Sequence, residues 1–146
     1  MGSSWSYNAK TKTVLIDPEF NGKLTGLPPD TKIIIFEEGR NCISKFNQPV
    51  NKDSFPNSIT HLSFGDSFNQ PVNKDSLPSF ITHLSFGWFF TQPVNELPDN
   101  LIFLELPEIY HHPLNNLPYG LKTLKISEKY PKTKIKLPFG CEIITK

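Results

Sequence analysis

The sequence predicts a mostly β solenoid in which short parallel strands alternate with proline-rich return segments that are not helical. A Leu-Pro or Phe-Pro dipeptide recurs at the same place in six units, and the intervals between these six prolines are 28, 22, 20, 20 and 20 residues. Each unit also contains one short stretch in which apolar and polar residues alternate. Such a period indicates stacked repeats, each of which completes the core of its neighbour. The six prolines are Pro28, Pro56, Pro78, Pro98, Pro118 and Pro138.

The alternating stretches predict the strands. Leu62-Ser63-Phe64 would place two apolar side chains on one face and a serine on the other, and similar stretches follow in later units. Alternation with a period of two is typical of a strand, and the β-branched residues nearby agree with this. Successive strands should then pair as one parallel sheet. We expect the strands at Val14, Ile34, Leu62, Leu84, Leu104, Leu124 and Ile144.

The return segments carry prolines and lack the residue spacing of an amphipathic helix. Because proline removes a backbone donor and breaks a helix interior, we expect extended chain or a single 3₁₀ turn and no α-helix. One aromatic residue recurs in each return segment, and these rings should stack as the spine of the solenoid. The aromatic column is Phe20, Phe46, Phe68, Phe90, Tyr110 and Tyr130.

The two ends of the chain receive different predictions. Residues 1–13 should form an N-terminal cap in which Trp5 and Tyr7 cover the first repeat, and residues 14–146 should form a domain of about six repeats. The opening Met-Gly-Ser-Ser-Trp-Ser fits a myristoylation signal at Gly2, and it also resembles the remnant of an expression tag.

Two further features bear on the return segments and on the compartment. About six extra residues within 37–45 should form a loop, because insertions in a solenoid leave the stacked frame. Cys42 and Cys141 would lie far apart along any solenoid, so we expect two free thiols and a reducing, cytoplasmic compartment. The sequence contains no run of 18 apolar residues, so we expect no transmembrane helix.

A five-residue motif connects the sequence to a known family. Phe-Asn-Gln-Pro-Val at residues 46–50 recurs at residues 68–72, and each copy is followed by Phe-Pro or Leu-Pro and then by Ile-Thr-His-Leu-Ser-Phe-Gly. This unit closely resembles the FNIP repeat, with Gln in place of Ile, and the resemblance extends over roughly residues 14–146. Residues 97–118 also resemble the Leu-Pro class of leucine-rich repeats in bacterial effectors, but the FNIP assignment fits the Asn position better.

The resemblance implies a leucine-rich-repeat-like solenoid of a family found mainly in social amoebae and their large DNA viruses. Two repeats depart from the motif, with Tyr-His-His-Pro at 110–113 and Tyr-Pro-Lys-Thr at 130–133, which puts a continuous asparagine ladder in doubt. Many viral relatives carry an F-box that recruits a ubiquitin ligase. The thirteen residues before Val14 are too few for an F-box, so a partner protein would have to supply that half of the role.

Catalysis is not predicted. The sequence lacks a nucleophile elbow, a phosphate-binding glycine loop, a zinc-protease motif and a paired-carboxylate pattern. His61 and His83 occupy the same position in adjacent repeats, but two histidines are too few for a structural zinc site. We therefore expect no enzyme activity, no metal and no cofactor.

Charge is distributed unevenly along the chain. From Lys122 onward, seven lysines face Glu128 and Glu142, a net charge of +5 that leaves −4 for the remainder, since the total is +1. Such lysines could contact nucleic acid, but lysines on a terminal repeat also discourage edge-to-edge association. We favour the second reading and expect neither nucleic-acid binding nor membrane binding, unless Gly2 is myristoylated.

The candidate binding residues lie where the repeat pattern predicts exposure. Trp88 and Phe89 replace the polar pairs that other repeats have in the same turn, and exposed aromatic residues mark partner sites. Local packing against the neighbouring turn is an equally good explanation of these two rings. The full set of predicted partner-binding residues is Trp88, Phe89, Ile109, His61, His83, Phe103, Ile33 and Ile35.

These observations predict a protein–protein interaction module that presents a surface to a host or partner protein. A narrower version, implied by the family, is substrate recruitment for a ubiquitin ligase in the cytoplasm, which would be the host cytoplasm if the protein is viral. The alternative is a structural protein that self-associates, for example as a homodimer, through the ends or edges of the solenoid.

Overall fold

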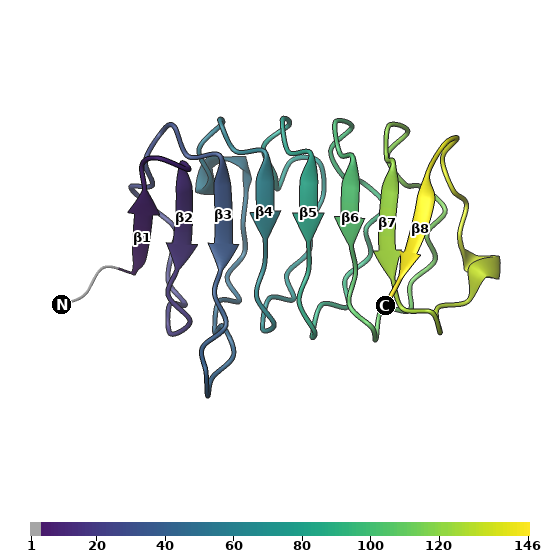
Figure 1. Ribbon diagram of the computed structural model, residues 1–146, viewed down its shortest axis with the longest axis horizontal. Coiled ribbons are helices and arrows are strands. Elements are labelled where there is room, and N and C mark those ends of the chain that lie inside the picture. Colours follow the sequence, from purple (N-terminus) through teal and green to yellow (C-terminus); the bar gives the residue numbers. More distant parts are fainter. Residues whose placement is uncertain (1–3) are drawn as a thin grey trace.

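The computed structural model describes residues 4–146, which form a single eight-stranded sheet whose strand order follows the chain (Figure 1). No α-helix occurs in this part of the chain, and the return segments contain only two 3₁₀ turns, η1 (Lys52–Ser54) and η2 (Lys132–Lys134). The predicted solenoid of short strands and non-helical returns is thus confirmed. The strands are β1 (Trp5–Asn8), β2 (Thr13–Ile16), β3 (Ile33–Phe36), β4 (His61–Ser63), β5 (His83–Ser85), β6 (Phe103–Glu105), β7 (Thr123–Ile126) and β8 (Glu142–Thr145).

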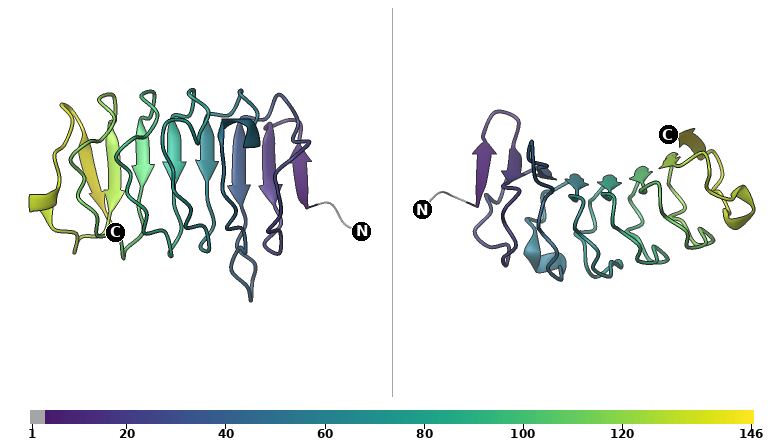
Figure 2. Two further views of the ribbon diagram at one scale, coloured as in Figure 1. Left: turned by 180° about the vertical axis from the view of Figure 1, so that it is seen from behind. Right: turned by 90° about the horizontal axis from the view of Figure 1, so that it is seen from below.

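The sheet lies along one side of a curved molecule. Strands β2 to β8 pair in parallel, while β1 pairs antiparallel to β2. Figure 2 shows that the strands line the concave side and that the return segments form the convex side. Alternate side chains of each strand point into the core, where Val14, Ile34 and Leu84 are fully buried. The other side chains of each strand form an open face on the concave side.

A small backbone irregularity precedes the parallel strands. The N–H groups of Lys122 and Thr123 both donate to the carbonyl oxygen of Ile102, and equivalent pairs donate before β3, β4, β5 and β6. Because two consecutive N–H groups donate to one carbonyl oxygen, each of these repeats has one more residue at this point than regular strand pairing would need. The repetition of this shared acceptor explains why the distance from proline to strand stays constant through the middle of the chain.

Counting from the repeat proline places Ile144 in the same column as the inward Leu124, and for the last strand this placement is wrong by one position. In β8, Ile143 pairs with Leu124, and Ile144 pairs with Lys125 on the open face. Only Glu142 donates to the Lys122 carbonyl oxygen, so the last repeat lacks the shared acceptor and its extra residue. Because side chains alternate along a strand, this single missing residue moves Ile144 from the core to the open face, where it is 48% exposed.

The aromatic spine forms as predicted. Each ring of the column is nearly parallel to the next, with ring centroids 6.0 Å apart for Phe20–Phe46 and Phe46–Phe68 and 6.5 Å apart for Tyr110–Tyr130. A second set of rings interleaves with it, since Phe64 lies 3.8 Å from Phe68. The contacts along the column join each repeat to the next, so the repeats stabilise one another.

An asparagine ladder runs beside the spine and stops where the motif changes. The Oδ1 atom of Asn47 accepts hydrogen bonds from the backbone N–H of Asn69 (2.9 Å) and from Nε2 of Gln70 (3.1 Å). In the same way, Asn21 accepts from Asn47 N–H and the Gln48 amide, and Asn69 accepts from Thr91 N–H and the Gln92 amide. No asparagine continues the ladder beyond Thr91 among the described residues. The ladder is therefore discontinuous, as expected, but it ends at Thr91, one repeat before the departures at 110–113 and 130–133.

The N-terminal hairpin covers the first repeat. Trp5 and Tyr7 of β1 are partly buried against the core, and the Tyr7 hydroxyl donates to Asp30 Oδ1 (2.7 Å). This hydrogen bond and the nearby carboxylate raise the pKa of Tyr7. The myristoylation signal at Gly2 lies outside the described residues. Within residues 4–146, no helix has the length and apolar character needed to cross a bilayer.

Candidate protein-binding face

Five of the predicted binding residues come together on the open face of the sheet. Ile33, Ile35, His61, His83 and Phe103 are half-buried and line a shallow cavity of about 250 Å³ across β3 to β6. The parallel register places them in neighbouring columns, with Ile33 beside His61, His61 beside His83, and His83 beside Phe103. We call these five residues the apolar row.

The two histidines behave as aromatic rings within this row. The His61 and His83 rings stack with centroids 4.0 Å apart and an angle of 11° between their planes, and His83 also stacks on Phe103 at 5.8 Å. The Nδ1 atom of His61 lies 2.8 Å from the hydroxyl of Thr60, and His83 has the same contact with Thr82. Burial, with a smaller contribution from the adjacent His83, lowers the pKa of His61. A neutral His61 ring therefore suits an apolar surface at neutral pH.

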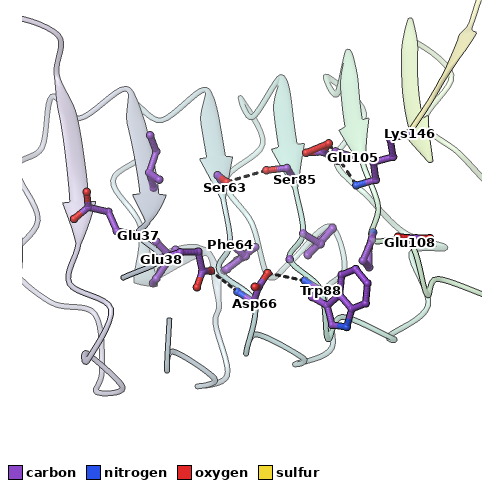
Figure 3. A pocket seen from close by; sticks show the side chains of 15 residues that line it. Glu37, Glu38, Ser63, Phe64, Asp66, Ser85, Trp88, Glu105, Glu108 and Lys146 are labelled. Atoms are coloured by element: carbon purple, nitrogen blue, oxygen red, sulfur yellow. Dashed lines mark hydrogen bonds and ion pairs between the residues drawn. The ribbon is translucent and has the colours of Figure 1, made fainter. Parts of the chain in front are cut away.

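A second, larger cavity of about 650 Å³ adjoins the apolar row at the carboxyl ends of the strands (Figure 3). The two cavities share Ile35, Ser63 and Ser85, so they form one continuous surface. The larger cavity is lined by five carboxylates and a single amine, that of Lys146. We call it the acidic hollow, and its carboxylates are Glu37, Glu38, Asp66, Glu105 and Glu108.

Two of these carboxylates hold the turns of the following repeats. Glu38 Oε1 accepts from the backbone N–H of Asp66 (2.7 Å), and Asp66 Oδ1 accepts from the backbone N–H of Trp88 (2.9 Å). The other oxygen of Glu38 accepts from Ser44 N–H (2.6 Å) and so ties the inserted loop, seen below β3 in Figure 1, to the same ladder. Trp88 occupies the position that a carboxylate has in the two preceding repeats. The ladder ends there, and the indole is left 47% exposed at the wall of the hollow.

Close backbone approach in these turns requires glycine. A Cβ atom on Gly65 would lie 2.3 Å from Ser44 Cβ, and one on Gly87 would lie 2.6 Å from Asp66 Cα. Neither backbone φ is unusual, so the constraint is space and not conformation. These glycines allow the carboxylate of one repeat to reach the N–H of the next.

The charge of the acidic hollow is balanced on one side only. Glu105 accepts ion pairs from Lys125 (3.0 Å) and Lys146 (3.5 Å), and Glu108 pairs with Lys129 at 3.7 Å. Among residues 4–146, no ion pair reaches Glu37, Glu38 or Asp66. The negative charge that lacks a cationic partner therefore gathers beside β3 and β4, next to Ile35.

The structure separates the remaining predicted residues. Trp88 joins the acidic hollow, whereas Phe89 and Ile109 lie in the turns and line neither cavity. These two side chains are 49% and 41% exposed. The eight predicted residues thus form a sheet-face group with Trp88 at its border and a separate pair on the turns.

Sequence reasoning missed an exposed aromatic pair in the last two repeats. Tyr119 and Phe139 follow the repeat proline directly and are 88% and 91% exposed. Tyr119 also lines a cavity of about 530 Å³ with Leu137 and Lys136. A signal was present, because the same position holds polar residues in earlier repeats, for example Asn57 and Ser79.

Within residues 4–146, no three His, Cys, Asp or Glu residues gather closely enough to hold a metal ion. Cys42 and Cys141 are both free thiols. The face offers apolar surface and charge, which suit the binding of a polypeptide.

The fold and its open sheet face define a repeat solenoid of the leucine-rich-repeat type. Residues 46–89 match the FNIP Repeat family, which confirms for this segment the resemblance to FNIP repeats. The matched segment contains two of the ladder asparagines, Asn47 and Asn69, both copies of the five-residue motif, and the turn of Trp88.

A solved structure supports the leucine-rich-repeat type of fold. CroV588 of the giant virus CroV, described as "a novel circular LRR protein structure", resembles the chain with a TM-score of 0.67 and 30% sequence identity. The match covers 81% of this chain and 17% of that chain, so this protein spans about a sixth of the length of its structural relative. No curated protein matches the chain.

Proposed function

We propose that the protein is an interaction module whose partner protein binds the open sheet face. The observation that carries this proposal is the apolar row, which lies across four adjacent strands with no segment of residues 4–146 covering its cavity. Contiguous exposed apolar surface of this kind commonly marks a partner site. The typical role of leucine-rich-repeat-like solenoids as scaffolds supports the same reading.

Affinity capture with two matched double variants tests the proposal. Ile35→Ser with Phe103→Ser removes the centre of the apolar row, and Tyr119→Ser with Phe139→Ser removes two equally large exposed residues elsewhere. A partner identified by mass spectrometry should be lost by the first variant and retained by the second. Loss by the second variant alone would assign binding to the Tyr119–Phe139 surface instead.

The family resemblance supports a narrower version, in which the bound protein is delivered to a ubiquitin ligase by an F-box protein. That version predicts that the captured material contains the ligase adaptor and that the partner becomes more abundant when the protein is removed from the cell. We place this activity in a reducing cytoplasm, the host cytoplasm if the protein is viral. The two free thiols support that location.

Self-association is the second candidate function, and the edge strand β8 favours it. On its outer side β8 has no neighbour among the described residues, and it carries the exposed Ile144. An unpaired edge of this kind can accept another strand. Light scattering over a concentration series should show a mass that rises with concentration and that Thr145→Pro returns to that of a monomer.

A further inference from the structure

Charge is distributed unevenly along the open face, from one end of the solenoid to the other, and this asymmetry identifies the class of its partner. The apolar row crosses four strands, a span of about 14 Å at the usual strand spacing. A segment of about four or five extended residues covers that length. Beside the row, the three carboxylates without cationic partners lie toward β3 and β4, whereas the balanced pairs lie toward β6 and β7.

We infer that the partner segment is a basic amphipathic peptide, whose apolar side chains lie on the apolar row and whose Arg or Lys enters the acidic hollow beside Asp66 and Trp88. This inference rests on the proposed protein-binding role and adds the chemistry of the partner. A neutral or acidic segment would leave the unbalanced carboxylates without a counter-charge, while a basic one neutralises them.

The geometry of Trp88 supports a cation at this position. Its backbone N–H donates to the Asp66 carboxylate, which holds the Trp88 backbone next to that carboxylate, and both residues line the hollow. An exposed indole face attracts Arg and Lys cations. Glu37 lines the same cavity and takes part in no ion pair among the described residues, so its charge is available to a ligand.

The far side of the hollow does not suit the same cation. Glu105 is already bound by two lysines from the last two repeats, and Glu108 by a third. A basic side chain placed there would meet Lys125, Lys129 and Lys146. The peptide should therefore bind in one orientation, with its charged residue toward β3 and β4.

A random dodecapeptide library displayed on phage and selected on the full chain provides the first test. Enriched peptides should carry net positive charge together with at least two aliphatic or aromatic residues. Enrichment of neutral or acidic peptides, or no enrichment above an unrelated protein, would overturn the inference. The consensus peptide is then synthesised and its affinity measured by fluorescence anisotropy.

Charge-neutralising variants provide the second test. Glu37→Gln with Asp66→Asn removes two charges, and the asparagine keeps an oxygen that can accept from Trp88 N–H. The double variant should bind the consensus peptide about tenfold more weakly, because each exposed charge pair adds only a modest share of affinity. Glu96→Gln with Asp99→Asn makes the same charge change at exposed positions that line a different cavity and should alter affinity less than about twofold.

A third comparison isolates the indole and separates this inference from the proposed function. Trp88→Leu should weaken binding, whereas Phe89→Leu, the neighbouring exposed ring outside the hollow, should not. Each variant is first shown to unfold at the wild-type urea concentration. If Ile35→Ser with Phe103→Ser abolishes binding while the charge variants leave it unchanged, the face binds peptides but not by charge. If neither set matters, both proposals are wrong.

Discussion

The repeats between Phe46 and Phe90 and the repeats after Tyr110 share one spine but hold their turns differently. In the first region, asparagine and carboxylate side chains of one repeat accept from backbone N–H groups of the next. In the second, the Tyr130 hydroxyl donates to the His112 carbonyl oxygen, and lysines pair with carboxylates across repeats. The stacked rings and parallel strands continue through both.

This difference shows which parts of the repeat the fold requires. Apolar rings and inward strand residues occur in both regions, so they are the common requirement of stacking. The polar ladders are local solutions for the backbone groups of the turns and can be replaced by other hydrogen bonds. The FNIP match at residues 46–89 covers the region where the ladders are complete.

Removal of one ring from the middle of the spine should have the largest effect. Phe68→Ala leaves a cavity between two stacked neighbours and should lower the free energy of unfolding by about 3–5 kcal/mol in urea denaturation. Tyr130→Ala is the matched change in the second region and should cost less, because Tyr130 stacks only on Tyr110. Equal losses would show that the spine is no more tightly coupled in its middle than at its end.

A methyl group added where repeats approach most closely should have the next largest effect. Gly87→Ala would place Cβ 2.6 Å from backbone atoms of the preceding repeat and should destabilise the fold by about 2–3 kcal/mol. Gly120→Ala is the control from the second region, since its nearest neighbour would be 3.7 Å away. We expect a change below about 0.5 kcal/mol there. A similar midpoint of thermal unfolding for both variants would contradict the close packing of the first region.

Interruption of the asparagine ladder should have a moderate effect. Asn69→Ala removes the acceptor for Thr91 N–H and for the Gln92 amide, and it should cost about 1–2 kcal/mol in urea denaturation. Asn116→Ala removes one exposed hydrogen bond to Asn95 in the second region and should cost less than about 0.5 kcal/mol. If Asn69→Ala were as mild as its control, the ladder would contribute nothing beyond solvent contacts.

The smallest expected effect is a pH dependence of folding stability that arises from His61, in the first region. Because the folded chain lowers the pKa of His61, the unfolded chain binds more protons between the folded value and the ordinary value of about 6.5. Stability should therefore be complete above pH 6.5 and should fall as the pH decreases through that window. Urea midpoints between pH 5 and 8 should show this slope in the wild type and a weaker one in His61→Phe, which keeps an aromatic ring in the stack.

Much of the fold follows from the repeat period, but its last strand does not. Counting from each proline locates Leu62, Leu84, Leu104 and Leu124 correctly, since the same extra residue precedes each strand. That count fails at Ile144 because the last repeat lacks the residue, and no sequence signal marks a missing backbone irregularity. Register depends here on one hydrogen-bond pattern, which only the stacked structure reveals.

The candidate face was predictable in part for a similar reason. The apolar row follows from the alternation of strand residues, so Ile33, His61 and Phe103 could be placed on the open face from sequence. The acidic hollow could not, because its carboxylates come from separate repeats. Whether each carboxylate has a cationic partner depends on where the lysine side chains of later repeats lie. Spacing alone gives no information about that balance.

The reversed direction of β1 has a consequence for lengthening the protein. A new unit of the common type brings a strand that needs a parallel neighbour, which β8 supplies and the outer side of β1 does not. Duplicated units inserted ahead of the hairpin would meet a mismatched hydrogen-bond pattern. Artificial arrays should therefore be extended beyond Thr145 or between internal units, and the N-terminal hairpin should be kept unchanged as the cap of the first repeat.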